Sequence, residues 1–180
     1  MGEPKGLVVF AGRPWIEAQL AALGGRRAVV VLGHDRRRYL EAIPDLPARA
    51  EVVVNPDPDR GPFSSLQVGL AAVGASPPAA AFVLPVDVPA ASAAVWDALE
   101  EALGPGLDAV IPVFEGRGGH PVLLAPPFIA HLCRRDPASP DARLDVELRS
   151  AKARMVPTGD PRVRLNLNAP EDWGKLAKGT

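Results

Sequence analysis

The sequence contains a single cysteine, few aromatic residues and no hydrophobic run of transmembrane length. Cys133 is alone among 180 residues, so the chain can form neither an internal disulfide nor a cysteine-rich zinc site. We expect Cys133 to be a small buried residue of a short helix over residues 128–133. The first residues lack the apolar core of a secretion signal. These absences predict a cytoplasmic setting and no membrane partner.

The chain also has no excess of charge of one sign. The formal net charge is −1, so nothing indicates a nucleic acid or a charged surface as the partner. A small anionic ligand remains compatible with this net charge, because the charge around a binding site need not follow that of the whole chain. The length and the ordinary globular composition predict one domain over residues 1–180.

Short β-branched runs alternate with Ala- and Leu-rich stretches. The expected strands are 28–32, 51–54, 80–84, 109–113 and 121–124. The expected helices are 15–23, 35–43, 64–73, 92–103, 143–151 and 169–177. We expect Ser92 to cap one of these helices and Pro85 to lie at the end of its strand. The alternation indicates an α/β protein with a mostly parallel sheet.

Two polar segments follow expected strands, where ligands of open α/β sheets bind. Residues 55–65 form a turn-rich loop into a helix, whose N-terminus suits an anion or a base edge; alternatively, Ser64 and Ser65 only cap that helix. Asp87, held between Val86 and Val88-Pro89, suits a hard cation such as magnesium, which needs few protein carboxylates. Alternatively, Asp87 caps a helix or belongs to a plain loop.

Two later segments carry further candidates. His120 follows a glycine-rich loop and is either a ligand contact or structural, whereas His34 and His131 have no matching partners. Asn166 and Asn168 alternate with leucines, which places both amides on one face of an extended segment. Asn168 is also a helix cap, so Asn166 is the better ligand candidate.

Taken together, the ordered segments resemble the molybdenum cofactor nucleotidyltransferases. The resemblance runs from Met1 to about Trp173. The matching segments are Met1-Gly2-Glu3-Pro4-Lys5, Gly12-Arg13-Pro14, Asn55-Pro56, Gly61, Ser64-Ser65-Leu66, Gly69-Leu70, Pro85-Val86-Asp87-Val88-Pro89, Gly119-His120-Pro121-Val122-Leu123 and Asn166-Leu167-Asn168-Ala169-Pro170-Glu171-Asp172. Ser64-Ser65-Leu66 resembles the cytidylyltransferase branch more than the guanylyltransferase branch.

This resemblance implies a three-layer, Rossmann-like nucleotidyltransferase fold of the GT-A kind, with a mostly parallel mixed sheet. It implies transfer of a nucleoside monophosphate, CMP rather than GMP, from a nucleoside triphosphate to a phosphorylated acceptor such as molybdopterin, with release of pyrophosphate. A molybdoenzyme or a cofactor-biosynthesis protein would be the partner. Lys5 and Asp87 would be catalytic, and Asp87, Asn166 and Asn168 would hold Mg²⁺. The nucleotide contacts would be Asn55, Gly61, Ser64, Ser65 and Gly69, and Gly119 and His120 would face the acceptor.

The chain departs from the family pattern in two places. The family has a strand and a loop, L-A-A-G-x-S-x-R, before the methionine; here either the chain begins inside a longer protein or it is a degenerate member. The run from Gly6 to Phe10 is a candidate for the empty strand position. Residues 141–145 replace the family's G-D-x-G-A-R, with Asp145 as a second acidic contact. A non-catalytic binding module and a sugar-phosphate nucleotidyltransferase or glycosyltransferase therefore remain alternatives.

Overall fold

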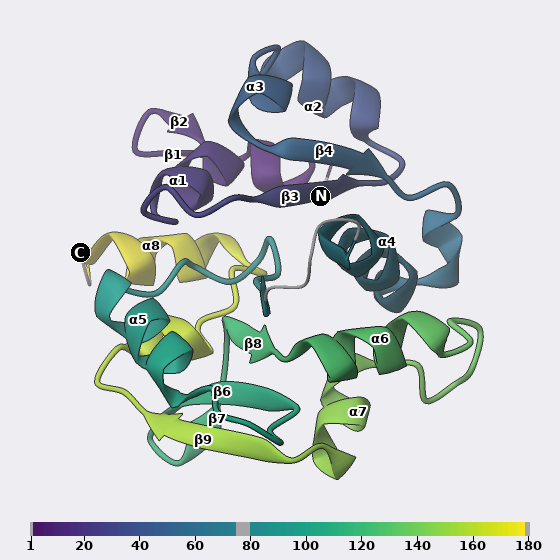
Figure 1. Ribbon diagram of the computed structural model, residues 1–180. Helices are drawn as coiled ribbons and strands as arrows, with labels where there is room; N and C mark the ends of the chain where they lie inside the picture. Colours follow the sequence, from purple (N-terminus) through teal and green to yellow (C-terminus); the bar gives the residue numbers. More distant parts are fainter. Residues whose placement is uncertain (1, 75–79, 179–180) are drawn as a thin grey trace.

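The computed structural model of the chain describes residues 2–74 and 80–178 (Figure 1). Its helices are α1 Trp15–Ala21, α2 Arg36–Ala42, α3 Leu46–Arg49, α4 Pro62–Gly74, α5 Ala93–Ala102, α6 Pro126–Arg134, α7 Leu144–Ser150 and α8 Pro170–Lys178. Its strands are β1 Val9–Phe10, β2 Arg13–Pro14, β3 Val29–Leu32, β4 Glu51–Val54, β5 Ala81–Val83, β6 Ala109–Phe114, β7 Arg117–Gly118, β8 Val122–Leu124 and β9 Ala153–Pro157. Short 3₁₀ helices cover Lys5–Leu7, Pro58–Arg60 and Pro161–Arg164. None of the described helices is long and apolar enough to cross a membrane.

The first half of the chain forms a small parallel sheet. β3 pairs with β4 in register from Val29–Glu51 to Leu32–Val54. The apolar residues of this half pack together under α1, α2 and α3, with Ile43 and Leu46 among the most buried. Helix α4 lies against β3, where Gly69 lets the two elements approach closely: a Cβ at Gly69 would lie 2.9 Å from Val31 Cγ2.

The second half forms a larger mixed sheet between two helical layers. Its strand order is β5-β8-β6-β7, with β9 on the other side of β6. β5, β6 and β7 join the sheet through antiparallel pairings, and β9 pairs with β6 in parallel. Successive residues of β6 and β8 alternate between a cluster under α4, α6 and α7 and a cluster under α5. This alternation produces three layers, with α5 on one side of the sheet and α6 and α7 on the other (Figure 1).

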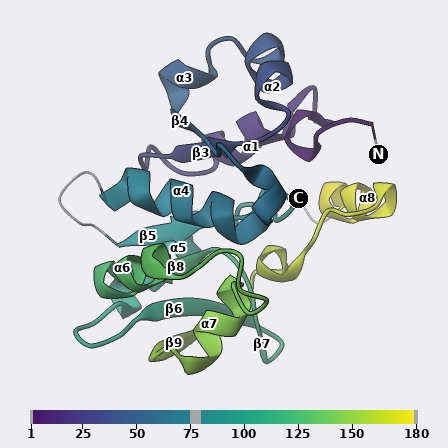
Figure 2. The ribbon, with the colours of Figure 1, turned by 90° about the vertical axis from the view of Figure 1, so that its right-hand side faces the viewer.

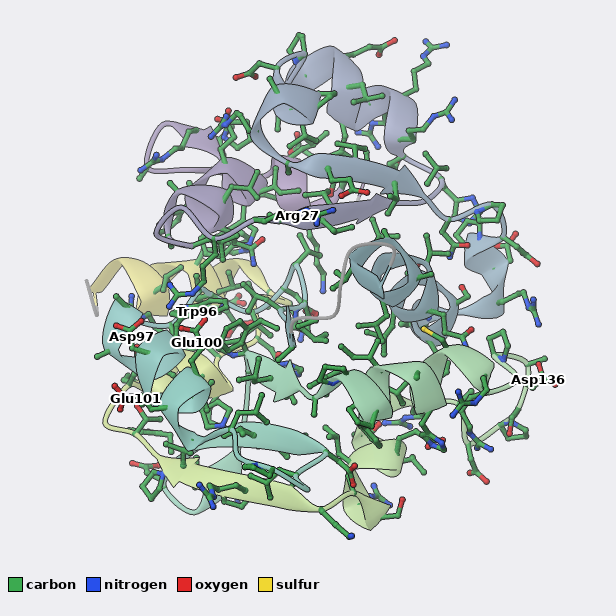
Figure 3. The ribbon with its side chains drawn as sticks, viewed as in Figure 1. Arg27, Trp96, Asp97, Glu100, Glu101 and Asp136 are labelled. Atoms are coloured by element: carbon green, nitrogen blue, oxygen red, sulfur yellow. The ribbon has the colours of Figure 1, made fainter. Side chains whose placement is uncertain are left out.

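Side chains connect the two halves. Arg26, in the loop before β3, forms ion pairs with Asp97 and Glu100 of α5 and lies over the Trp96 ring, 5.9 Å from its centroid. Figure 3 shows these three partners together on α5. In the part of the chain that is described, no ladder joins β3 or β4 to a strand of the larger sheet.

Most expected elements are confirmed to within about two residues. The α/β class and the mixed sheet are confirmed, although the larger sheet has more antiparallel pairing than we expected, because β8 returns alongside β6 after the β7 hairpin. Pro85 lies beyond the end of β5, as expected. No pattern in the sequence predicted α3, β7 or β9.

Three local expectations are wrong. Residues 6–10 do not fill the empty strand position: Gly6 belongs to a 3₁₀ helix, and Val9–Phe10 pairs only with Arg13–Pro14 among the described residues, around a turn in which Ala11 and Gly12 have positive φ. Cys133 is exposed, because α6 turns Phe128, Ile129 and Leu132 toward the core instead. The Ser92 side chain makes no cap bond; its N–H donates to Asp160 at 2.7 Å.

Candidate functional site

The centre of the candidate site is the turn at residues 85–88, which follows β5. All four of its backbone carbonyl groups accept hydrogen bonds. Gln19 Nε2 of α1 donates to the Pro85 and Val88 oxygens at 3.2 and 2.8 Å, and Trp15 Nε1 donates to the Val86 oxygen at 2.7 Å. The Asp87 oxygen accepts the Leu167 N–H at 2.7 Å. The turn is therefore held by α1 and by the segment before α8.

Lys5 lies between two oxygen atoms at this turn. Its Nζ is 3.1 Å from Asp87 Oδ2 and 2.6 Å from Asn168 Oδ1. The Lys5 and Asp87 side chains are 32% and 30% exposed, so the group remains open to a ligand. Gly6, next to Lys5, donates its N–H to the Tyr39 hydroxyl of α2 at 3.1 Å, which fixes the start of the chain here.

The carboxylate and the amide oxygen converge on one positive charge. Both atoms are of the type that Mg²⁺ and Mn²⁺ bind. The described residues contain no group of three or more His, Cys, Asp or Glu side chains placed to hold a metal. A divalent ion here would therefore have Asp87 and Asn168 as protein ligands and would need phosphate oxygens and water for the rest, which is a usual arrangement for magnesium. The residues present fit such an ion.

Asn166 and Asn168, predicted together, differ in their contacts. Asn168 accepts the Lys5 hydrogen bond, whereas Asn166 is exposed and makes no hydrogen bond within residues 2–74 and 80–178. Asp172 of α8 accepts the N–H groups of Asn168 and Ala169 at 3.1 and 3.0 Å. The side-chain oxygen of Asn168 is thus directed to Lys5. Our preference for Asn166 over Asn168 as the ligand candidate finds no support in this geometry.

Gly119 and His120 lie on the loop between β7 and β8. The His120 N–H donates to the Val163 oxygen at 2.9 Å, and its ring Nδ1 lies 3.3 Å from the Val83 oxygen at the end of β5. This contact makes Nδ1 the protonated nitrogen of the neutral ring and leaves Nε2 as an acceptor. Burial lowers the pKa of His120, although the Val83 bond and the Asp87 charge oppose this effect. His120 is therefore neutral at pH 7.

A second network lies at the start of α4. The buried Asn55 amide donates to Ser64 Oγ at 2.8 Å and Ser65 Oγ at 2.9 Å, and its oxygen accepts the Asp57 N–H at 3.0 Å. Ser64 Oγ donates to the Gly61 oxygen at 2.8 Å, so the two serines do not merely cap the helix. Gly61 has φ +87°, a conformation that favours glycine.

Figure 2 shows the start of α4, the N-terminal segment and α8 on the same side of the molecule. The elements that carry the Asn55 network therefore lie on the same side of the molecule as those that carry Lys5 and Asn168. Gly69 is different, because its position is explained by the packing of α4 on β3. Asp145 pairs with Arg143 and Arg149 on the surface of α7 and does not join the group.

Four residues near the site were not predicted from the sequence. They are Trp15 and Gln19, which hold the Asp87 turn; Tyr39, which holds Gly6; and Arg164, whose Nη1 donates to the Gly118 oxygen at 2.5 Å beside the His120 loop. Only Gln19 had a usable signal, as a polar residue on an otherwise apolar helix face. A hollow of about 760 Å³ between α5 and residues 156–162 contains none of the predicted site residues.

Several solved structures share this fold. The Rv0371c protein of Mycobacterium tuberculosis has a TM-score of 0.77 at 19% identity, covering 99% of this chain and 90% of its own, and another structure of it contains manganese. The molybdopterin-guanine dinucleotide biosynthesis protein A of Archaeoglobus fulgidus has a TM-score of 0.72 at 19% identity, covering 99% and 93%. A 4-diphosphocytidyl-2C-methyl-D-erythritol synthase has a TM-score of 0.72 at 17% identity, covering 97% and 92%.

At these identities the solved structures show the fold, a mixed-sheet α/β nucleotidyltransferase architecture. The chain has no significant sequence match among curated proteins. A sequence-family model does match, and it covers residues 1–151, most of the chain. On this match, with the fold in agreement, the chain belongs to the family of MobA-like NTP transferase domains.

Proposed function

We propose that this protein transfers a nucleoside monophosphate from a nucleoside triphosphate to a phosphorylated small-molecule acceptor and releases pyrophosphate. The observation that carries the proposal is the convergence of Asp87 Oδ2 and Asn168 Oδ1 on a single positive charge. Such a pair holds a cation where triphosphate oxygens can complete its coordination. Membership of an NTP transferase family supports the same reaction class.

The protein's part in this reaction is positioning and charge neutralisation. A bound Mg²⁺ or Mn²⁺ would supply charge neutralisation at the α-phosphate and at the leaving pyrophosphate. Asp87 and Asn168 would hold that ion. Lys5 would turn from Asp87 to a phosphate oxygen, which its flexible side chain and partial exposure permit. Manganese in the related Rv0371c structure supports a divalent ion of this kind.

The Asn55 network belongs to nucleotide recognition in this proposal. The Asn55 amide is already hydrogen-bonded to Ser64 and Ser65, so its role is to orient these two serines. Ser65 is the more exposed of the two serines and is the one that would contact the nucleotide. Gly61 supplies the turn. Gly119 and His120 would face the acceptor, with the neutral His120 Nε2 free to accept a hydrogen bond from it.

We infer CTP rather than GTP as the donor from Ser64-Ser65-Leu66, and molybdopterin as the acceptor from the family likeness. Structural neighbours named for a guanine dinucleotide and for a diphosphocytidyl product support either base. We further propose that residues 1–180 act as one NTP-transferase-like domain in the cytoplasm. There it would meet a molybdoenzyme or a cofactor-biosynthesis partner, without nucleic acid or membrane.

The test is thermal unfolding of the protein with CTP, GTP, ATP or UTP, with and without MgCl₂, beside Asp87→Asn and the surface control Asp145→Asn. A nucleotide at 100 times its Kd stabilises a protein by about 2.7 kcal/mol, which corresponds to a Tm rise of about 5–10 °C. We expect this rise with one nucleotide, dependent on magnesium and absent in Asp87→Asn only. An acceptor screen with that nucleotide then tests for pyrophosphate release. Nucleotide binding with no pyrophosphate release, whichever acceptor is added, would favour the non-catalytic binding module.

A further inference from the structure

We infer that Gln19 and Trp15 of α1 are positioning residues for the Asp87 metal–nucleotide site. This inference rests on the proposed function and identifies which part of the fold sets the position of the Asp87 carboxylate. Trp15 and Gln19 are four residues apart, one helical turn, so their side chains project from the same face of α1. Both donate to the backbone of the Asp87 turn.

Gln19 is among the few buried polar residues of the described chain, at 7% exposure. A buried amide costs free energy unless it is hydrogen-bonded. Among the described residues, Gln19 finds its partners at the Asp87 turn alone, through two bonds from one Nε2. The opposite amide orientation would set its oxygen against two carbonyl oxygens. The residue is therefore specific in type as well as in position.

The turn is clamped at both sides of Asp87. Gln19 holds the carbonyl groups of Pro85 and Val88, and Trp15 holds that of Val86. The remaining carbonyl, that of Asp87, accepts the Leu167 N–H, which places Asn168 next to the Asp87 carboxylate. With α1 on one side and residues 167–168 on the other, the distance between the two proposed metal ligands depends on both clamps.

Loss of the α1 clamp should therefore weaken metal–nucleotide binding without removing a ligand. Mutation of residues that orient metal ligands through hydrogen bonds typically lowers metal affinity by about 10- to 100-fold. Gln19→Met removes both donors at similar length, and Trp15→Phe removes one donor and keeps an aromatic ring beside Phe10 and Trp173. Ile16→Val is the matched control, because Ile16 lies on the same helix but belongs to the buried cluster that contains Leu7 and Leu32.

The experiment measures binding of Mn²⁺–CTP and Mn²⁺–GTP by water-proton relaxation enhancement, with the Tm of each variant recorded. We expect Gln19→Met and Trp15→Phe to raise the Kd by about 10-fold or more. Ile16→Val should leave the Kd unchanged even where it lowers the Tm. Asp87→Asn should abolish binding.

The outcomes separate the two proposals. If Asp87→Asn abolishes binding while Gln19→Met and Trp15→Phe bind like the wild type, the positioning inference alone is overturned. An equal loss in Ile16→Val would also overturn it, because general destabilisation would then explain the effect. If the wild type binds neither complex, or Asp87→Asn binds normally, the proposed function fails and this inference fails with it.

Discussion

Lys5 and Asp87 are 82 residues apart in the sequence and form an ion pair of 3.1 Å. The pair joins the beginning of the first half of the chain to the turn after β5 in the second half. Because Asn168 shares the same ammonium group, Lys5 occupies the position that a divalent ion would take. Lys5 and the ion should therefore compete until a triphosphate offers Lys5 another partner.

The first prediction follows from this competition. Lys5→Met should bind Mn²⁺ more tightly than the wild type when no nucleotide is present. Partly exposed ion pairs contribute about 1 kcal/mol or less, so the gain should be at most about fivefold. Electron paramagnetic resonance of free Mn²⁺ measures it directly. Lys152→Met removes the same charge from an exposed position on another part of the chain and should leave Mn²⁺ affinity unchanged. Weaker binding by Lys5→Met would contradict the competition.

The second prediction concerns pH. Burial lowers the pKa of His120 below the ordinary value of about 6.5, so between these two values the unfolded chain binds more protons than the folded one. The free energy of unfolding should therefore fall as the pH drops below about 6.5, by at most about 1.4 kcal/mol per pH unit, and level off below the folded pKa. Urea unfolding of the wild type and His120→Gln from pH 8 to pH 5 measures the effect. Parallel curves for the two proteins would refute it.

The third prediction concerns Gly119. A Cβ at this residue would lie 2.0 Å from the Val163 oxygen, which also accepts the His120 N–H. Gly119→Ala should separate these two segments and lower the free energy of unfolding by about 1–3 kcal/mol. Gly159→Ala is the control, because a Cβ there meets no atom within 4 Å. Chemical denaturation of both variants gives the comparison, and equal stabilities would show that the loop relaxes freely.

The fourth prediction concerns Glu147, a buried carboxylate of α7. It accepts hydrogen bonds from Arg135 Nε at 2.6 Å and His131 Nε2 at 2.8 Å. Glu147→Gln keeps the size and removes the charge, so it should lower the free energy of unfolding by about 1–3 kcal/mol. Asp145→Asn on the same helix breaks only exposed ion pairs and should cost less than about 1 kcal/mol. The reverse order of the two losses would contradict this account.

The sequence predicted those features that depend on residues close together along the chain. The valine runs of β3 and β4 and the Pro62-to-Gly74 helix region are visible as local patterns, so their positions were correct to within about two residues. The approach of Asn168 to Asp87 followed from the family resemblance rather than from any local pattern. The expected environments of Cys133 and Ser92 were wrong. The rotation of α6 leaves Cys133 exposed, and the Ser92 N–H binds a distant acceptor, Asp160.

The role of Gln19 and Trp15 could not be found this way, although Gln19 stands out as a polar residue on an otherwise apolar helix face. Their partners are backbone carbonyl groups about 70 residues away, and a carbonyl group is present at every residue whatever its type. No residue pattern at 85–88 indicates which donors will reach it. Long-range bonds from a side chain to the backbone are therefore the part of this site that only the three-dimensional structure could supply.

The boundary between the β3–β4 sheet and the larger mixed sheet forms a seam, which the side chains of Trp15, Gln19 and Arg26 cross. In the described chain no ladder hydrogen bonds cross it, so the two sheets can separate without either one losing its own pairing. Lys5 lies on one side of the seam and Asp87 on the other. A triphosphate bound to both would hold the two sides together, and hydrogen exchange of the Trp15 indole N–H, which donates across the seam to the Val86 oxygen, would report whether the donor substrate is in place.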